Sequence, residues 1–325
     1  MEINDDELSY SIDFINKLKS SYKQSIIGQE DLLITLLISL FTENHLLIEG
    51  VPGLAKTRAV NTIAQSTSLK FKRVQFTPDL LPSDLVGNLV FNPKDAKYFV
   101  KTGPVFTNIL LADEINRAPA KVQSALLESM QEKQVTIGEN SYQLPVPFVV
   151  LATQNPIEQE GTFNLPEAQV DRFLLKTLIT YPSNQEEIEV LNLLEKGSSI
   201  NVRPIATPED ILKIRDIVKK VTFAPKLKEY VVSLVDCTRH PDKYGLKDLQ
   251  NIISYGVSPR AGIAFLQAGK AYALLQGKKH VEPEDIKKLS YDVLRHRILL
   301  SFEAEADQIK VESVIEKIIN TVKVP

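Results

Sequence analysis

The sequence predicts an α/β fold in which a mainly parallel sheet is followed by a smaller, all-helical domain. In the first half of the chain, short apolar runs alternate with helix-like segments, which is the pattern of parallel strands joined by helices. After Tyr181 the strand-like runs end and apolar residues recur at helical spacing. We therefore expect a domain boundary near Tyr181, with one domain over residues 1–181 and a second over residues 182–325.

Five apolar runs are predicted to be buried strands, because each is rich in Leu, Ile, Val or Phe. They lie at residues 46–49, 71–76, 109–112, 148–153 and 173–180. Two further pairs of runs are separated by short polar turns, which predicts two hairpins that project from the sheet. These pairs are residues 89–91 with 98–100, and residues 135–137 with 142–144. The spacing does not give the order of the strands.

Apolar spacing and capping residues indicate the helices. The apolar run at residues 32–41 is shorter than the ~20 residues needed to span a bilayer, so it predicts a buried helix and no membrane insertion. In the second domain, Thr207 and Ser258 each precede a proline, as a helix cap precedes proline at the first helical position. Residues 261–275 then show apolar positions at helical spacing.

The composition is that of an ordinary globular protein with a substantial core. The chain has 325 residues, of which 43 % are hydrophobic and 24 % charged. Its acidic, polar start does not resemble a secretory signal, and its one cysteine, Cys237, excludes an intramolecular disulfide and a cysteine-based metal site. We therefore expect a cytoplasmic location.

Neither the charge nor the histidines indicate binding to nucleic acid or to a histidine-held metal. The formal net charge of −3 supplies no overall attraction to nucleic acid. The four histidines are widely scattered and are interpreted as structural or surface residues. They are His45, His240, His280 and His296.

The segment from Gly50 to Thr57 is predicted to bind the phosphates of a nucleotide. It lies between the strand at residues 46–49 and a helix-like segment at residues 58–65. In this order, glycines let successive backbone N–H groups point at one anion, and the helix N-terminus adds positive partial charge. Lys56 would reach the terminal phosphates and Thr57 would ligate Mg²⁺. The expected contacts are Gly50, Pro52, Gly53, Leu54, Ala55, Lys56, Thr57 and Arg58.

Ala55 departs from the usual loop pattern, because it stands where that pattern has its second glycine. The backbone at this position must therefore tolerate a methyl group. Taken alone, the segment could instead be a glycine-containing turn that precedes Lys-Thr by chance.

An acidic pair at a strand end favours the nucleotide interpretation. The apolar run at residues 109–112 is followed by Asp113 and Glu114. A carboxylate here can hold Mg²⁺, a role we assign to Asp113, and Glu114 can act as general base towards the attacking water. Alone, the pair could simply mark a strand that enters solvent. Asn155, after a later strand, could orient the same water, although by itself it is an ordinary turn residue before proline.

These motifs together resemble those of the MoxR family of AAA+ ATPases. The resemblance is carried by residues 50–57, 75–84, 113–118, 152–156, 165–173 and 258–261, and it therefore covers nearly the whole chain. The alanine before the lysine is normal in that family. Several independent motifs in one order are hard to obtain by chance.

The resemblance implies a P-loop α/β core followed by a helical lid, with ATP bound between them and subunits assembled in a ring, usually a hexamer. It implies that Asn155 is the first sensor and that Arg260 is the second sensor, on the lid. Ile27 and Gly28 would lie near the adenine.

The resemblance also implies an arginine finger that reaches the nucleotide of a neighbouring subunit. Arg172 is the residue that matches this role, although its neighbour Asp171 offers a local ion pair instead. Arg117, just past the acidic pair, is an alternative for the arginine supplied in trans.

The implied function is chaperone-like remodelling, in which Mg²⁺-dependent ATP hydrolysis matures a partner complex. A protein with a von Willebrand factor A domain is the expected partner. One alternative is a nucleic-acid motor, which would need basic hairpin tips, whereas Lys94 and Lys97 flank Asp95 in the first hairpin and Glu139 makes the second acidic. The other alternative is a scaffold that binds ATP with slow turnover. The sequence does not identify a client.

Overall fold

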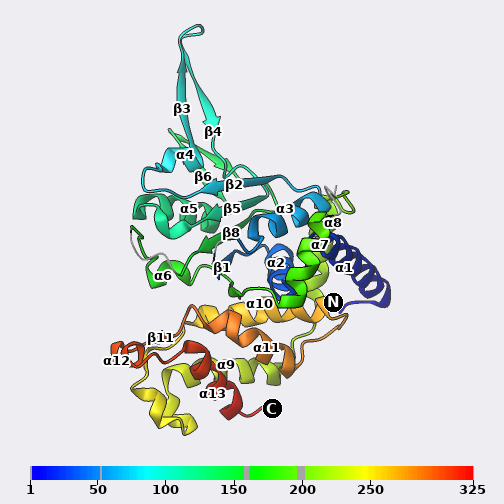
Figure 1. The fold of residues 1–325 in the computed structure, drawn as a ribbon, viewed down its shortest axis with the longest axis vertical. Coiled ribbons are helices and arrows are strands. Elements are labelled where there is room, and N and C mark those ends of the chain that lie inside the picture. Colours follow the sequence, from blue (N-terminus) through cyan, green and yellow to red (C-terminus); the bar gives the residue numbers. More distant parts are fainter. Residues whose placement is uncertain (1, 52, 157–160, 196–201, 325) are drawn as a thin grey trace. The chain divides into compact units, whose positions relative to one another are not determined.

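The computed structural model describes residues 2–51, 53–156, 161–195 and 202–324. These residues form two compact units that are interleaved along the chain (Figure 1). One unit comprises Phe14–Phe173 with Thr177–Lys213, and the other comprises Leu174–Lys176, the chain from Ile214 onward and the residues up to Asp13. The predicted domains are two continuous stretches, and their boundary after residue 181 stays a prediction.

A five-stranded sheet has the strand order β2-β5-β8-β1-β9. The pairs β2–β5, β5–β8 and β8–β1 are parallel, so helical crossovers join the strands. The strands are β1 (Leu46–Gly50), β2 (Phe71–Gln75), β5 (Ile109–Asp113), β8 (Val149–Gln154) and β9 (Leu175–Ile179). The five predicted strands are thus confirmed.

Helices alternate with these strands along the chain, and the predicted buried helix is confirmed as α2. The helices up to residue 195 are α1 (Asp5–Ser25), α2 (Glu30–Thr42), α3 (Lys56–Ser66), α4 (Pro82–Val86), α5 (Ala120–Glu132), α6 (Glu167–Val170) and α7 (Asn184–Glu195), with a 3₁₀ turn at Ile115–Arg117.

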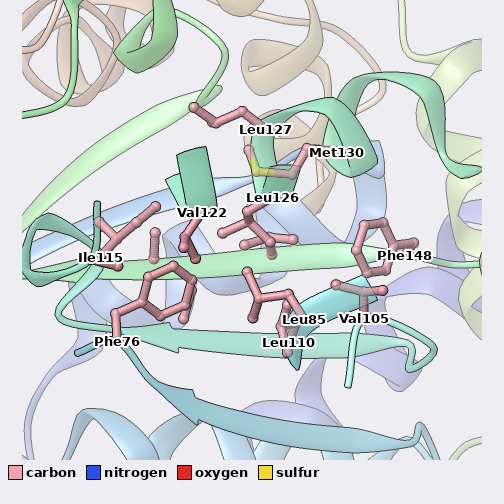
Figure 2. Packing of buried hydrophobic residues seen from close by; sticks show 14 of the residues in the cluster. Phe76, Leu85, Val105, Leu110, Ile115, Val122, Leu126, Leu127, Met130 and Phe148 are labelled. Atoms are coloured by element: carbon pink, nitrogen blue, oxygen red, sulfur yellow. The ribbon is translucent and has the colours of Figure 1, made fainter. Parts of the chain in front are cut away.

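Apolar side chains on both faces of the sheet explain why its central strands read as continuous hydrophobic runs. Successive residues of a strand point to opposite faces. On one face, Leu110 and Val150 belong to a buried cluster with Leu126 of α5 (Figure 2). On the other face, Ile109 and Val149 line a narrow cavity together with residues of α2 and α3. The sheet is therefore covered by helices on both sides.

The two predicted hairpins are confirmed as antiparallel pairs. The first joins β3 (Gly87–Asn92) to β4 (Lys97–Thr102), and the second joins β6 (Gln134–Ile137) to β7 (Asn140–Gln143). Figure 1 shows β3 and β4 as a long ribbon that extends away from the sheet.

The second unit is built mainly from helices: α8 (Pro208–Lys220, which begins in the first unit), α9 (Pro225–Arg239), α10 (Pro259–Leu275), α11 (Pro283–Leu294), α12 (Phe302–Ala306) and α13 (Val311–Thr321), with 3₁₀ turns at Pro241–Tyr244 and Lys247–Gln250. The predicted caps are confirmed, because Ser258 Oγ accepts the N–H of Arg260 at 3.2 Å and Thr207 Oγ1 accepts that of Asp210 at 3.4 Å.

The expectation that this part of the chain is entirely helical was wrong in one detail. Strands β10 (Ile253–Tyr255) and β11 (Leu299–Leu300) form a short antiparallel pair. Runs of two or three residues are too short for a pattern of alternation to be recognised. In the part of the chain that the structure describes, no helix is long and apolar enough to cross a membrane.

Candidate nucleotide-binding site

The loop between β1 and α3 has the backbone conformation of an anion-binding turn. Gly53 has φ 89° and Ala55 has φ 55°, and α3 begins immediately afterwards at Lys56. A positive φ is easy for glycine, whereas it costs an alanine about 1–2 kcal/mol. The departure from the usual glycine at residue 55 is therefore accommodated by local backbone strain. Pro52 lies outside the described residues.

Gly50 has a structural role besides the one predicted for it in the loop. A Cβ atom at Gly50 would lie 2.8 Å from the carbonyl oxygen of Ile179 on β9. At Gly53, by contrast, an added Cβ would meet no heavy atom of the chain within 4 Å, and the positive φ is what favours glycine there. Gly50 thus allows β1 and β9 to approach closely where the loop starts.

The side chain of Lys56 is held over the loop. Its ammonium group donates a hydrogen bond to the carbonyl oxygen of Gly50. Partial burial lowers the pKa of Lys56, and the carboxylates of Asp113, Glu114 and Glu49 oppose this shift. The ammonium group therefore spans the loop that would hold the phosphates, and the acidic pair favours its charged form.

A pocket of about 390 Å³ lies beside this loop and unites most of the predicted site residues. Asp113, Glu114 and Asn155 line it from the ends of β5 and β8. From the loop and the start of α3, the lining residues are Gly50, Gly53, Leu54, Ala55, Lys56, Thr57 and Arg58. Parallel strands place their carboxyl ends at one edge of the sheet, which explains why these distant segments meet.

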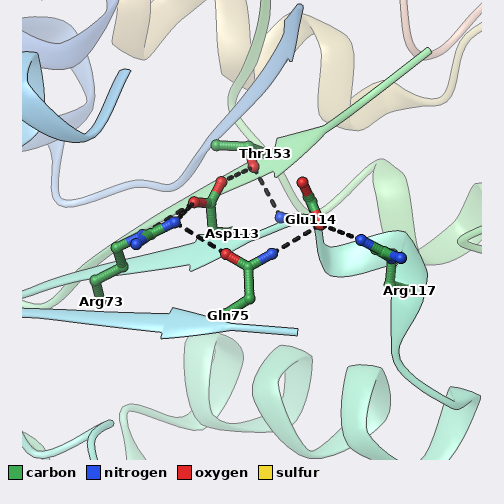
Figure 3. Close-up of polar contacts among 6 residues, drawn as sticks. All are labelled: Arg73, Gln75, Asp113, Glu114, Arg117 and Thr153. Carbon is green, nitrogen blue, oxygen red and sulfur yellow. Dashed lines mark hydrogen bonds and ion pairs between the residues drawn. The ribbon is translucent and has the colours of Figure 1, made fainter. Parts of the chain in front are cut away.

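Thr153 orients the acidic pair, and sequence reasoning missed it. Its Oγ1 donates to Asp113 Oδ1 at 2.6 Å and accepts the backbone N–H of Glu114 at 2.8 Å (Figure 3). Glu114 itself has φ 56°, so the chain turns sharply after β5. The signal that could have found Thr153 is its place at the end of the predicted strand at residues 148–153, two residues before Asn155.

Arg73 and Gln75 of the edge strand β2 also hold the acidic pair, and both were missed. Arg73 donates to Asp113 Oδ2 from Nε at 3.0 Å and from Nη2 at 2.6 Å. Its Nη2 also donates to Gln75 Oε1 at 2.9 Å, and Gln75 Nε2 donates to Glu114 Oε2 at 2.7 Å (Figure 3). One hydrogen-bonded chain therefore connects the two carboxylates.

The two candidate finger arginines lie in different surroundings. Arg117 Nη1 pairs with Glu114 Oε2 of its own chain at 3.0 Å. Arg172 is not among the residues that line the pocket; its Nη1 donates to the carbonyl oxygen of Leu127 at 3.0 Å, and its Nε is buried without a hydrogen-bond partner in the described part of the chain.

The remaining predicted residues are not among those that line the pocket. Ile27 and Gly28 precede α2, and Gly28 has φ 67° with the carboxylate of Glu186 packed where a Cβ would stand. Arg260 is exposed in the first turn of α10, in the other unit. Their predicted contacts with a nucleotide stay predictions.

The residues of the pocket fit a nucleotide with a bound Mg²⁺. A left-handed loop followed by a helix N-terminus suits phosphate oxygens, and Lys56 adds a positive charge. Thr57 and Asp113 supply the hydroxyl and carboxylate oxygens that Mg²⁺ prefers, and phosphate and water oxygens usually complete its shell. Chemically, the arrangement suits transfer of a phosphoryl group to water.

Comparison with known proteins gives a consistent family. Residues 45–175 match the model of the "ATPase family associated with various cellular activities (AAA)", and residues 248–318 match the "AAA lid domain". The chain is 44 % identical to "Chaperone MoxR1" of Mycobacterium tuberculosis, over 93 % of this chain and 80 % of that protein. It is 30 % identical to "Protein MoxR" of Paracoccus denitrificans, over 92 % of this chain and 93 % of that protein.

A solved structure from Cytophaga hutchinsonii has the same fold. It matches with a TM-score of 0.92 and 47 % identity, and the match covers 98 % of this chain and 97 % of that one. The similarity therefore extends over both compact units.

Proposed function

This chain belongs to the MoxR family of AAA+ ATPases, and we propose that it uses Mg²⁺-dependent ATP hydrolysis to remodel or mature a partner protein complex. ATP hydrolysis and a chaperone-like role are what the family membership supports. We further propose the roles of individual residues, the bound metal, the ring and the partner.

The observation that carries the proposal is the convergence of Lys56, Thr57, Asp113, Glu114 and Asn155 on one pocket. The backbone N–H groups of the loop and Lys56 would bind the phosphates, and Thr57 and Asp113 would hold Mg²⁺. When bound, the metal neutralises charge on the phosphate oxygens. Glu114 would accept the proton of the attacking water, and Asn155 would orient that water.

A ring assembly would complete each site with an arginine from the neighbouring subunit. Arg172 is the better candidate, because Arg117 is already paired with Glu114 of its own chain, whereas Arg172 is not among the residues that line its own pocket. An arginine supplied in trans stabilises the charge on the transferred phosphoryl group and is worth about 10³–10⁵ in rate. Because the family resemblance implies a ring that is usually a hexamer, we propose that this chain assembles as a hexamer.

The proposal has three further parts, which are a contact from the lid, a contact with the adenine and a partner protein. Arg260 would sense the γ-phosphate from the lid, and Ile27 with Gly28 would border the adenine. A protein with a von Willebrand factor A domain is the proposed partner, on the family resemblance. The cytoplasm is the proposed location, because the single cysteine suits a reducing compartment.

Phosphate release per subunit, measured with and without Mg²⁺ over a wide range of protein concentration, tests the chemistry and the assembly together. We expect specific activity to rise with concentration. Glu114→Gln and Arg172→Ala should both lose activity while they still bind a fluorescent ATP analogue. Glu128→Gln, an exposed change of the same kind on α5, is the matched control.

Two outcomes would contradict the proposal. If hydrolysis did not need Mg²⁺, the roles of Thr57 and Asp113 would be wrong. If Arg172→Ala kept full activity in an assembly that sizing shows to be intact, the finger would be another arginine.

A further inference from the structure

The β3–β4 hairpin exposes large apolar side chains to solvent. The exposed fractions are 69 % for Tyr98, 50 % for Phe91, 50 % for Phe99 and 45 % for Leu89. A concentration of exposed apolar side chains on a projecting element is typical of an interaction site rather than of a surface that has only to stay soluble.

The register of the two strands assigns these side chains to two faces. Residues paired directly across an antiparallel ladder share a face, so Leu89 with Val100 and Phe91 with Tyr98 form one face. The rings of Phe91 and Tyr98 lie with their centroids 5.2 Å apart. The opposite face carries Phe99 between two lysines of β4. These lysines are Lys97 and Lys101.

The hairpin is closely packed at its base and hydrogen-bonded at its tip. At its base, added Cβ atoms would lie 2.3 Å from the carbonyl oxygen of Lys101 at Gly87 and 2.7 Å from Leu89 Cδ1 at Gly138, so glycines allow close packing there. At its tip, Asn92 Nδ2 donates to Asp95 Oδ2 at 2.6 Å. A binding surface that is already ordered loses little conformational entropy when a partner binds.

The outer edge of β4, which is the edge that does not pair with β3, is available for pairing. β3 and β4 form a two-stranded sheet, and no third strand joins them within the residues that the structure describes. Edge strands of this kind offer unpaired N–H and C=O groups to another extended chain.

The positive charge of the two lysines on β4 favours an acidic partner. An antiparallel pairing of two copies of β4 centred on Phe99 would place Lys97 of each copy opposite Lys101 of the other. Like charges directly opposite one another are destabilising, and lysines on an edge strand discourage self-association. An acidic strand is favoured instead, because each of its carboxylates would face a lysine.

We propose that the outer edge of β4 binds an extended segment of a partner protein in which acidic and apolar residues alternate. The acidic side chains pair with Lys97 and Lys101, and the apolar side chains pack on Tyr98 and Val100. This inference rests on the proposed remodelling function, for which the segment is the part of the client that the ATPase holds.

A single-stranded nucleic acid is the competing ligand, since aromatic side chains and lysines also suit stacked bases and phosphates. The hairpin favours a polypeptide for two reasons. Phe91 and Tyr98 pack against each other, and the aliphatic Leu89 and Val100 share their face. An unpaired backbone edge, moreover, is a feature that a peptide strand uses directly.

Fluorescence anisotropy of labelled synthetic peptides tests the proposal on the full-length protein. One peptide alternates Glu with Val and Ile; a second has Lys in place of Glu; a third has Pro at alternate positions, which removes the N–H groups that a strand needs. We expect only the first to bind, and we expect added salt to weaken its binding because the lysines are exposed.

The double variant Lys97→Glu, Lys101→Glu should weaken binding of the first peptide about tenfold or more, since two attractions become repulsions. The matched control, Lys226→Glu with Lys228→Glu, makes the same charge change on exposed residues of α9 and should bind normally. Tyr98→Ser tests the apolar contact without a charge change. Circular dichroism checks that each variant is folded.

Three results would overturn the proposal. The acidic and basic peptides could bind equally well, the double variant could bind the first peptide as tightly as the wild type, or no peptide could bind. Tight binding of a single-stranded oligonucleotide that the double variant loses would replace the peptide by nucleic acid. ATP turnover without peptide is measured on the same samples. If the wild type did not hydrolyse ATP, the proposed function would be contradicted. If it hydrolysed ATP but bound no peptide, only the proposed peptide site on the hairpin would be contradicted.

Discussion

The guanidinium of Arg73 binds one carboxylate oxygen of Asp113 through two nitrogens, at 3.0 and 2.6 Å. The Asp113 side chain is 16 % exposed and that of Arg73 is 47 % exposed, so the pair lies at the rim of the pocket. Arg73 and the Mg²⁺ proposed for this site are both cations attracted to Asp113, and they therefore compete for it.

Replacing Arg73 should make the site bind Mg²⁺ more readily. We expect Arg73→Gln to lower the Mg²⁺ concentration needed for half-maximal binding of a fluorescent ATP analogue roughly two- to fivefold, since a half-exposed ion pair is worth up to ~1 kcal/mol. Lys72→Gln is the matched control, because Lys72 is exposed on the opposite face of the same strand. A higher Mg²⁺ requirement in Arg73→Gln would mean that the arginine assists the metal.

Thr153 should be needed for the geometry of the acidic pair. Thr153→Val keeps the shape of the side chain but removes the hydroxyl that serves Asp113 and the N–H of Glu114. We expect phosphate release to fall at least about tenfold, since small displacements of reacting groups are costly. The variant should also lose about 1–3 kcal/mol of stability, because a buried partner is removed.

Thr153→Ser provides the control, since it retains a hydroxyl in the same position. It should keep most of the activity. Activity is measured as phosphate release at saturating ATP. If Thr153→Val were as active as the wild type, the two carboxylates would be held adequately without the Thr153 hydroxyl.

The strands, the loop and the acidic pair could be predicted because each is a local signal. A strand run, a glycine-containing turn and Lys-Thr at a helix start are read within a few residues. Arg73 and Gln75 could not be assigned in this way. Gln75 lies opposite Asp113 only because β2 pairs with β5, and the spacing of runs along the chain does not give that pairing.

The choice between the two candidate finger arginines marks another limit of sequence reasoning. Arg172 and Arg117 both follow motifs of the site, and the sequence alone leaves both open. The contact of Arg117 with Glu114 depends on the turn that Glu114 makes after β5. Such a turn in a residue other than glycine is uncommon and is not signalled by residue type.

The only cysteine should be inert in the folded protein. Cys237 lies buried in α9, and burial, together with the nearby charge of Asp236, raises the pKa of its thiol to about 11. The reactive thiolate is therefore scarce at neutral pH. We expect almost no reaction with 5,5′-dithiobis(2-nitrobenzoate) in buffer and complete reaction in denaturant. Rapid labelling of the native protein would show that this part of α9 opens readily.

His45 should make the stability of the first unit depend on pH. Its ring joins two elements of the core, since Nε2 lies 3.2 Å from the carbonyl oxygen of Met130 and Nδ1 accepts the N–H of Val150 at 3.0 Å. Burial lowers the pKa of His45 from 6.5 to about 4; Met130 and Glu43 oppose this shift and Lys133 adds to it. The ring is therefore neutral in the folded protein near neutral pH.

Between pH 6.5 and about 4 the unfolded chain binds a proton at His45 that the folded chain does not. The free energy of unfolding should therefore be largest above pH 6.5 and should fall by up to about 3 kcal/mol as the pH drops through this window. Urea unfolding of the wild type and His45→Gln at several pH values measures this contribution. The variant should be less stable near neutral pH but should lose less stability on acidification.

His280→Gln is the matched control, because the side chain of His280 is 63 % exposed. Its unfolding free energy should follow that of the wild type more closely than the unfolding free energy of His45→Gln does. If His45→Gln and the wild type lost stability in parallel between pH 6.5 and 4, the folded protein would be accepting a proton at His45. The hydrogen bond from Val150 would then have to break in the native state, because a protonated ring has no free acceptor at Nδ1.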